Sequence, residues 1–296
     1  MTPNTPKFEQ FKAKRESWIE CLSGKDRNSI RNQLLRMIWN AAAYRVVNGA
    51  RRIAPPAKEG GVQLNGLMHR VIDVCFFDSQ LAGIRRLTDT YPLTGERAVY
   101  SLTGLMEDMR ENAHLMTREN IFAAEELAYD YEPIRKASEE YAMEQGRAGN
   151  RACFVPPHLN WHRPAERHRE IDRLAGVAED SRSGGDAVRP EVLNQLEARV
   201  KNVCENAKAH VDKFVAHAGT PESRESVIAG KLDVTLGHLW DAHEVLCKVA
   251  NFIDWFLLTG STSSFLRTPE YDHLAYIEKP LVTRDQIKEL HEVWHR

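Results

Sequence analysis

The sequence lacks a strong charge of either sign and has no long apolar run. It carries 40 Lys and Arg against 42 Asp and Glu, for a formal net charge of −2. A chain this balanced has no overall basic field to attract nucleic acid or membranes, so any such partner must bind a local patch. The longest apolar stretch, Asn251 to Leu258, contains Asp254 and is far too short to cross a bilayer.

Signals for export and for disulfide formation are also missing. The first ten residues, MTPNTPKFEQ, lack the charged start and apolar stretch of a signal peptide. The cysteines are odd in number and widely spaced, which is typical of reduced core residues and not of a disulfide framework. We therefore expect a cytoplasmic protein with no membrane partner. The five cysteines are Cys21, Cys75, Cys153, Cys204 and Cys247.

Motifs that bind nucleotides or build common hydrolase sites are absent as well. The sequence contains no GxGxxG, no Walker loop, no G-x-S-x-G and no set of kinase motifs. Nucleotide-dependent and α/β-hydrolase chemistry are therefore disfavoured, and we expect no cofactor.

Helical periodicity, interrupted by Gly and Pro, dominates what is present. It predicts an all-α protein that forms a single helical domain over residues 1–296. The segment DSRSGGD, residues 180–186, is the best candidate for a flexible linker, and only 153–155 and 276–282 look extended. The expected helices lie near 7–22, 27–51, 65–90, 95–115, 118–145, a short one from 164, then 190–217, 233–258 and one from 283.

Three patterns could suggest a metal site, and each has a structural objection. His291-Glu292-x-x-His295 matches the HExxH pattern of zinc proteases, but only one residue follows it, where a third ligand would be needed. His238 and His243 are five residues apart, about 140° around a helix, so one ion cannot easily bind both. Glu111-x-x-His114 is half of a di-iron signature and has no second half. We therefore predict no zinc and no other metal.

The helix expected over 190–217 carries the most informative pattern. Apolar residues at three- and four-residue spacing predict one buried seam: Leu193, Leu196, Val200, Val203, Ala207, Val211 and Phe214. Beside this seam, at about 100° per residue, a polar stripe falls within an arc of roughly 80°: Arg199, Asn202, Asn206, His210, Lys213 and His217. A neutral His beside a Lys can transfer protons near pH 7. The alternative is structural, because a His at the margin of a seam often only hydrogen-bonds a neighbour and a Lys can snorkel.

Three stretches resemble the HEPN superfamily, in particular its abortive-infection, AbiU-type branch. They are FFDSQLAGIRRLTD (76–89), LTGERAVYSLTGLMEDM (93–109) and NAKAHVDKFVAHA (206–218). The resemblance implies an antiparallel helical bundle with additional helices, whose core helices lie near 27–51, 65–90, 95–115 and 190–217. It also implies a homodimer and, in active members, a metal-independent ribonuclease with an Arg-x4–6-His motif at the dimer cleft.

The sequence departs from that motif at the helix that should carry it. No Arg stands four to six intervening residues before His210 or His217; the nearest such position before His210 holds Glu205, and the nearest base before His217 is Lys213. Matches elsewhere occur at about the rate expected by chance. They are Arg151 to His158, Arg163 to His168 and Arg267 to His273.

Two classes of function remain open. The first is a defence- or toxin-associated ribonuclease, active or degenerate, that acts on RNA and is neutralised by an antitoxin or another protein partner. In it, His210 and His217 would transfer protons, Lys213 with Arg199 would hold phosphate, Asn206 would orient a neighbour and Asn202 would contact the substrate. The second is a non-catalytic helical module for dimerisation or protein interaction.

Overall fold

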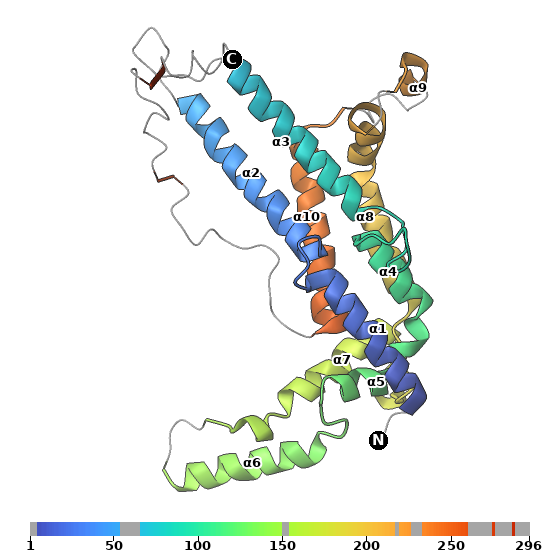
Figure 1. Ribbon diagram of the computed structural model, residues 1–296. Coiled ribbons are helices and arrows are strands. Elements are labelled where there is room, and N and C mark those ends of the chain that lie inside the picture. The colour runs from blue at the N-terminus through green and yellow to red at the C-terminus, as the bar shows by residue number, and fades with distance from the viewer. Residues whose placement is uncertain are drawn as a thin grey trace.

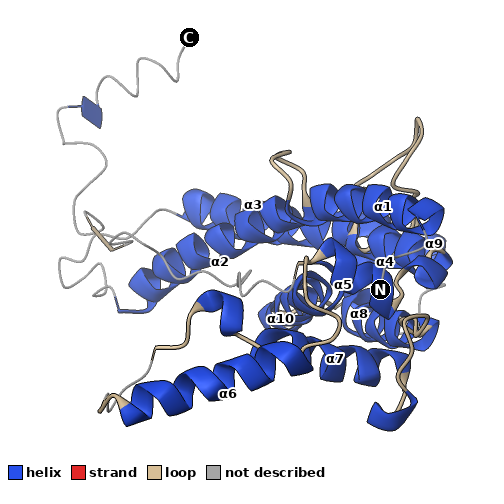
Figure 2. Ribbon diagram, turned by 90° about the horizontal axis from the view of Figure 1, so that it is seen from below, coloured by secondary structure: helices blue, strands red, loops and turns tan. Residues whose placement is uncertain are grey.

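The computed structural model describes residues 5–53, 66–149, 154–216, 219–225, 233–259, 274–275 and 286–287. Every regular element in these ranges is helical, and the only β pairing among them is an isolated bridge between Thr117 and Ala187. The prediction of an all-α fold is therefore confirmed (Figure 2). None of the helices built from these residues is both long and apolar enough to cross a membrane.

Four long helices form the main bundle (Figure 1). They are α2 (Ile30–Ile53), α3 (Gly66–Leu87), α8 (Pro190–His210) and α10 (Leu236–Phe252). The helix α8 packs against α3 and α10, and α2 packs against α3 and α10. At one end the bundle is extended by α1 (Thr5–Ser23) and α4 (Leu102–Glu111), which contact α2 and α8 respectively.

The centre of the bundle holds a buried polar chain that joins three helices. The His243 Nε2 group donates to Gln80 Oε1 at 2.7 Å, and Gln80 Nε2 donates to the Met37 carbonyl at 3.1 Å. Burial, with a smaller contribution from Arg45, lowers the pKa of His243 to about 4. The imidazole is therefore neutral at pH 7, and this histidine aligns α2, α3 and α10 without carrying charge.

Two predicted helices have different limits in the structure. The helix expected from residue 95 starts only at Leu102, because the Ser101 side chain accepts a hydrogen bond from Gly104 N and caps it. The helix expected over 118–145 is two helices, α5 (Arg118–Ala124) and α6 (Glu132–Arg147). Pro133 lies in the first turn of α6, where a missing N–H is tolerated, and it could not have continued α5 without a kink.

Below the bundle, α6 projects away from the other helices, and α7 (His162–Ala175) connects this arm to the rest (Figures 1 and 2). A network of two arginines, one of them fully buried, joins α7 to α5 and to residues 182–186. The Arg118 side chain is fully buried and donates to Asp172 at 2.8 Å, to Asp186 at 2.9 Å and to His168 Nδ1 at 3.0 Å. Arg182 also pairs with Asp172. We call these five residues the arginine network.

The arginine network holds the segment that the sequence suggested as a linker. The backbone N–H groups of Arg118 and Glu119 donate to the carbonyls of Asp186 and Gly184 at 2.7 and 3.0 Å. Residues 180–186 are therefore tied to α5 and α7.

Both α8 and α10 end in a π-helical turn, Val211–Val215 (η5) and Ile253–Leu258 (η6). Buried Arg167 of α7 donates to the Phe256 carbonyl at 2.9 Å, and Arg15 of α1 donates to the Leu258 carbonyl at 2.7 Å. These bonds satisfy carbonyls in η6 and hold that end of α10 in place. The turn η5 lies at the opposite end of the bundle and contains Lys213 of the polar stripe.

The cysteines follow the prediction with one exception. Cys21, Cys204 and Cys247 are buried, whereas Cys75 is exposed on α3 because it faces away from the bundle. Phe154 and Val155 form no strand. The segment expected to be extended over 276–282, Cys153 and the HExxH residues fall outside the described residues. Of the helix expected from 283, only residues 286–287 are described, and they are helical.

Candidate functional site

The residues of the predicted stripe lie along α8 and into η5, and they differ in exposure. Arg199 and Asn202 are exposed, whereas Asn206, His210 and Lys213 are partly buried near the end of the helix. His217 lies outside the described part of the chain. Arg199 and Lys213 are fourteen residues apart, about 21 Å along a helix axis. The pKa of Glu244 on α10 is lowered mainly by Lys248 and, to a smaller extent, by the charge of Arg199. This axial distance separates Arg199 from His210 and Lys213.

The turn η5 is where the polar residues gather. The Ala216 N–H donates to the Val211 carbonyl at 2.8 Å, the five-residue spacing of a π-helix. Lys213 Nζ donates to Ser223 Oγ at 2.7 Å, and the Gly219 N–H donates to the Lys213 carbonyl at 3.0 Å. These bonds fix the short helix α9 (Pro221–Glu225) beside the end of α8.

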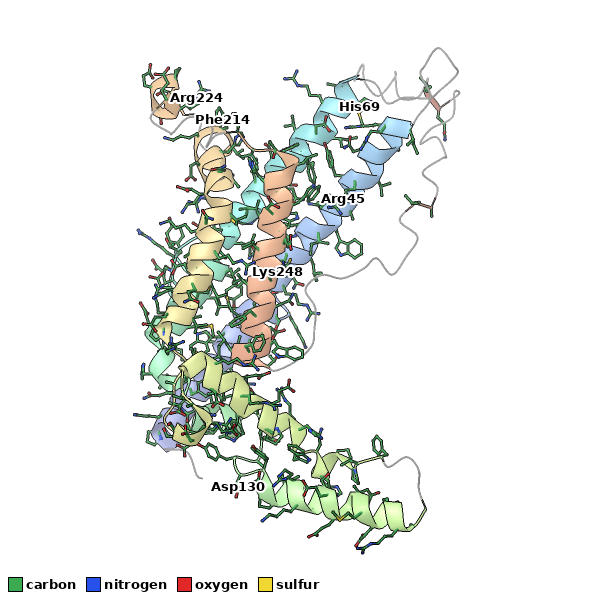
Figure 3. All side chains as sticks on the ribbon, turned by 180° about the vertical axis from the view of Figure 1, so that it is seen from behind. Arg45, His69, Asp130, Phe214, Arg224 and Lys248 are labelled. Atoms are coloured by element: carbon green, nitrogen blue, oxygen red, sulfur yellow. The ribbon has the colours of Figure 1, made fainter. Side chains whose placement is uncertain are left out.

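An exposed aromatic ring lies among these basic groups (Figure 3). The rings of His210 and Phe214 have centroids 4.8 Å apart and an interplanar angle of 33°. On Phe214, the Arg224 guanidinium carbon lies 5.4 Å from the ring centroid, within cation–π range. His210, Lys213, Phe214, Ser223 and Arg224 thus form one group, which we call the terminal cluster.

Phe214 corrects the sequence prediction, which placed it in the buried seam. Its side chain is 44% exposed, whereas Leu193, Val200, Ala207 and Val211 are buried as expected. A π-helical turn rotates the chain by less per residue than an α-helix does, so the register is lost after Val211. Phe214 therefore leaves the seam and faces solvent beside the polar stripe.

An ion-pair group anchors η5 to α3. Arg85 Nε donates to Asp212 Oδ1 at 2.9 Å, and the same guanidinium pairs with Asp89. Burial alone would lower the pKa of Arg85, but its bonds to the two carboxylates outweigh that effect and raise it. The group fixes Asp212, and with it the neighbouring Lys213, relative to the bundle.

The other histidines highlighted by the sequence have structural roles. In the Arg163 to His168 match, His168 is buried: its Nε2 donates to the Tyr129 carbonyl at 2.8 Å and its Nδ1 accepts from Arg118. Burial lowers the pKa of His168. His238 caps α10 through Thr235, while His243 lies in the core. Across the described ranges, no three His, Cys, Asp or Glu side chains converge as metal ligands.

Comparison with known proteins identifies the family. A model of the HEPN family described as AbiU2 matches residues 11–276. No curated protein and no solved structure matches the chain. The matched region contains the main bundle, the arginine network and the terminal cluster, and the match confirms the resemblance drawn from three stretches of the sequence. The chain belongs to the AbiU2 family of HEPN proteins.

Proposed function

We propose that this protein is a defence-associated HEPN protein that binds RNA at the terminal cluster and cleaves it without a metal ion. One observation carries the proposal: His210 and Arg224 lie against the exposed ring of Phe214, and Lys213 bonds Ser223 on the same short helix as Arg224. Single-stranded nucleic acid is typically bound by an aromatic ring that stacks on a base and by cations that contact its phosphates. The terminal cluster offers both within one turn of helix and one short neighbouring helix.

RNA carries its own nucleophile, the 2′-hydroxyl next to each phosphate. Cleavage therefore needs a base for that proton, an acid for the leaving oxygen and cations that stabilise charge on the phosphate. We assign His210 to one proton transfer and His217 to the other. Lys213 and Arg224 supply the positive charge that an Arg-x4–6-His motif would otherwise provide; Lys213 keeps two N–H donors besides the one given to Ser223.

The test is cleavage of a labelled single-stranded RNA by purified protein in EDTA. Loss of a proton-transfer group typically costs about 10²- to 10⁴-fold in rate. His210→Ala and His217→Ala should therefore abolish cleavage and leave the helical circular-dichroism signal unchanged. His158→Ala is the matched control, because His158 is exposed in the 3-10 turn Pro157–Leu159, far from the cluster in sequence. An intact protein that cleaves no RNA and causes no toxicity contradicts the proposal.

A second function, a non-catalytic dimerisation module, is favoured by a different surface. Leu67, Val71 and Val74 are exposed on α3 at four- and three-residue spacing, with Met68 beside them. This spacing is typical of a seam buried between helices. A second copy of the chain is the occupant we propose, because in a two-fold dimer one apolar strip can pack against itself.

Mass measurement in solution tests the dimer. We expect a homodimer at micromolar concentration that dissociates in Val71→Asp, because a buried unpaired charge is costly. Met143→Asp should remain dimeric, since Met143 is also apolar and exposed but lies on α6. A monomeric wild-type protein would contradict the dimer, and a dimer without RNA cleavage would favour the interaction module.

A further inference from the structure

A cavity of about 330 Å³ lies beside α8, away from the terminal cluster. It is lined by the segment that follows α3, the start of α4 and one edge of α8. Lys208 on this edge and Arg199 on the stripe are nine residues apart, about 180° around a helix, so the cavity and the stripe lie on opposite sides of α8. Its lining comprises Thr88, Thr90, Thr103, Glu197, Val200, Lys201, Cys204, Glu205 and Lys208.

The wall from α3 and α4 is a rigid hydroxyl surface. Ser101 Oγ donates to the Asp89 carbonyl at 2.7 Å, which ties the start of α4 to the end of α3. A Cβ on Gly104 would lie 2.6 Å from the Tyr91 carbonyl, so only glycine permits this approach. Thr103 stands in the first turn of α4 and is 6% exposed. Its hydroxyl has no hydrogen-bond partner among the described residues, although it lines the cavity.

The wall from α8 carries charge above an apolar floor. Val200 and Cys204 are buried and form the floor. Of the charged residues, Glu197 accepts a hydrogen bond from Arg110 of α4 and is neutralised by it. Lys201 and Lys208 take part in no ion pair within the described part of the chain. Glu205 lies between them on the same edge, so the two ammonium groups outnumber the one remaining carboxylate, and the edge favours an anion.

We infer that the cavity binds a small phosphate-bearing molecule. Lys201 and Lys208 hold its phosphate, the Thr103 hydroxyl hydrogen-bonds the ligand, and the floor packs against the ligand's less polar part. The volume lies at the lower end of the range of about 300 to 1,000 Å³ for small-molecule sites, which suits a mononucleotide or a smaller compound. This site goes beyond the proposed RNA-binding function and does not use its residues.

Binding of adenosine 5′-monophosphate, inorganic phosphate and adenosine, measured by titration calorimetry on the whole protein, tests the site. The monophosphate should bind at least about tenfold more tightly than adenosine, because a hydrogen bond to a charged group contributes roughly 1.5 to 3 kcal/mol. If the monophosphate binds more tightly than inorganic phosphate, the ligand of the site is nucleotide-like. If the two compounds bind with equal affinity, the ligand of the site is free phosphate.

Variants locate the site. Lys201→Ala with Lys208→Ala should weaken binding of the monophosphate by about tenfold or more, whereas Lys12→Ala with Lys136→Ala, two exposed lysines on α1 and α6, should not. Thr103→Val keeps the shape and should weaken binding without lowering the melting temperature, because its hydroxyl makes no internal bond. Phe214→Ala should leave the affinity unchanged and so separates this site from the terminal cluster. The inference is overturned if wild-type protein binds neither phosphate compound at millimolar concentration, or if the lysine pair is dispensable.

Discussion

The terminal cluster and the arginine network both contain arginine and histidine and use them in opposite ways. In the arginine network, Arg118 has no exposed surface, and two carboxylates and a histidine surround it. In the terminal cluster, Arg224 rests on the face of Phe214, and that ring is open to solvent. Buried and fully bonded groups are committed to the fold, whereas exposed groups beside an aromatic ring can bind a partner.

His168 and His210 differ in the same way. The His168 ring is buried with both nitrogens bonded, one to Arg118 and one to the Tyr129 carbonyl. His210 is only partly buried and stacks against Phe214. The Arg-x4–6-His spacing is matched at His168. Partial exposure and the contact with Phe214 instead favour His210 as the proposed site residue. Burial, more than spacing, therefore separates a histidine that supports the fold from the one proposed for proton transfer.

The largest effect is expected from breaking the arginine network. Arg118→Ala removes the charge between Asp172 and Asp186, and loss of one partner of a buried ion pair typically costs about 3 to 5 kcal/mol. Arg135→Ala is the control: Arg135 pairs with Glu132 and Glu139 on the exposed arm α6, where such pairs contribute little. Urea unfolding measures both. An Arg118 variant as stable as the control would show that the network is not structural.

The pH dependence of stability should report the buried His243. Because burial lowers its folded pKa to about 4 and the unfolded pKa is about 6.5, the unfolded chain binds more protons between these values. Stability is therefore fully present above about pH 6.5 and falls as the pH drops towards 4. By linkage, this histidine accounts for about 2 kcal/mol of the loss between pH 7 and 5.

His243→Gln provides the measurement, since the amide can still donate to Gln80 but cannot titrate. Urea unfolding at pH 7 and pH 5 should show a smaller loss of stability for this variant than for the wild type. His158→Gln, at an exposed position, should behave like the wild type. An identical pH dependence in all three proteins would rule out a neutral buried His243.

Much of the fold could be predicted from the sequence because helical periodicity is a local signal. The start of α8 at Pro190 and its buried seam up to Val211 follow directly from residue spacing. The arginine network could not be predicted this way, because Arg118 and Asp186 are separated by 68 residues and neither belongs to a periodic pattern. Only the folded chain brings them together.

The candidate site was predicted in part. Spacing on one helix placed His210 and Lys213 on the same side, and the structure adds Ser223 and Arg224 from α9, a helix that the sequence pattern did not predict. Phe214 was assigned to the core because the spacing rule assumes an α-helix throughout. The π-helical turn does not follow α-helical spacing, and no pattern in the local sequence predicts it.

A smaller effect should follow from removing the exposed ring of the terminal cluster. Phe214→Ala should weaken binding of single-stranded RNA by about 1 to 3 kcal/mol, the usual contribution of one base stacked on an aromatic ring. Phe154→Ala is matched to it, because Phe154 is also exposed and lies near α7. Fluorescence anisotropy at fixed salt measures both. Equal affinities for the two variants would remove Phe214 from the RNA-binding surface.

The smallest effect concerns Lys213 and is read from salt dependence. Each phosphate contact on a single strand contributes about 0.7 to the slope of log affinity against log salt. Lys213→Ala should therefore lower that slope by about 0.7 and weaken binding similarly for all RNA sequences, because phosphate contacts carry no sequence information. Ser223→Ala separates this role from a structural one: it removes the 2.7 Å bond that Lys213 donates but keeps the charge, so the slope should stay at the wild-type value. Lys136→Ala, on the exposed face of α6, should also leave it unchanged. If Ser223→Ala and Lys213→Ala reduce affinity equally with no change in slope, Lys213 only fastens α9 to the end of α8, and the phosphate contact must be assigned to Arg224.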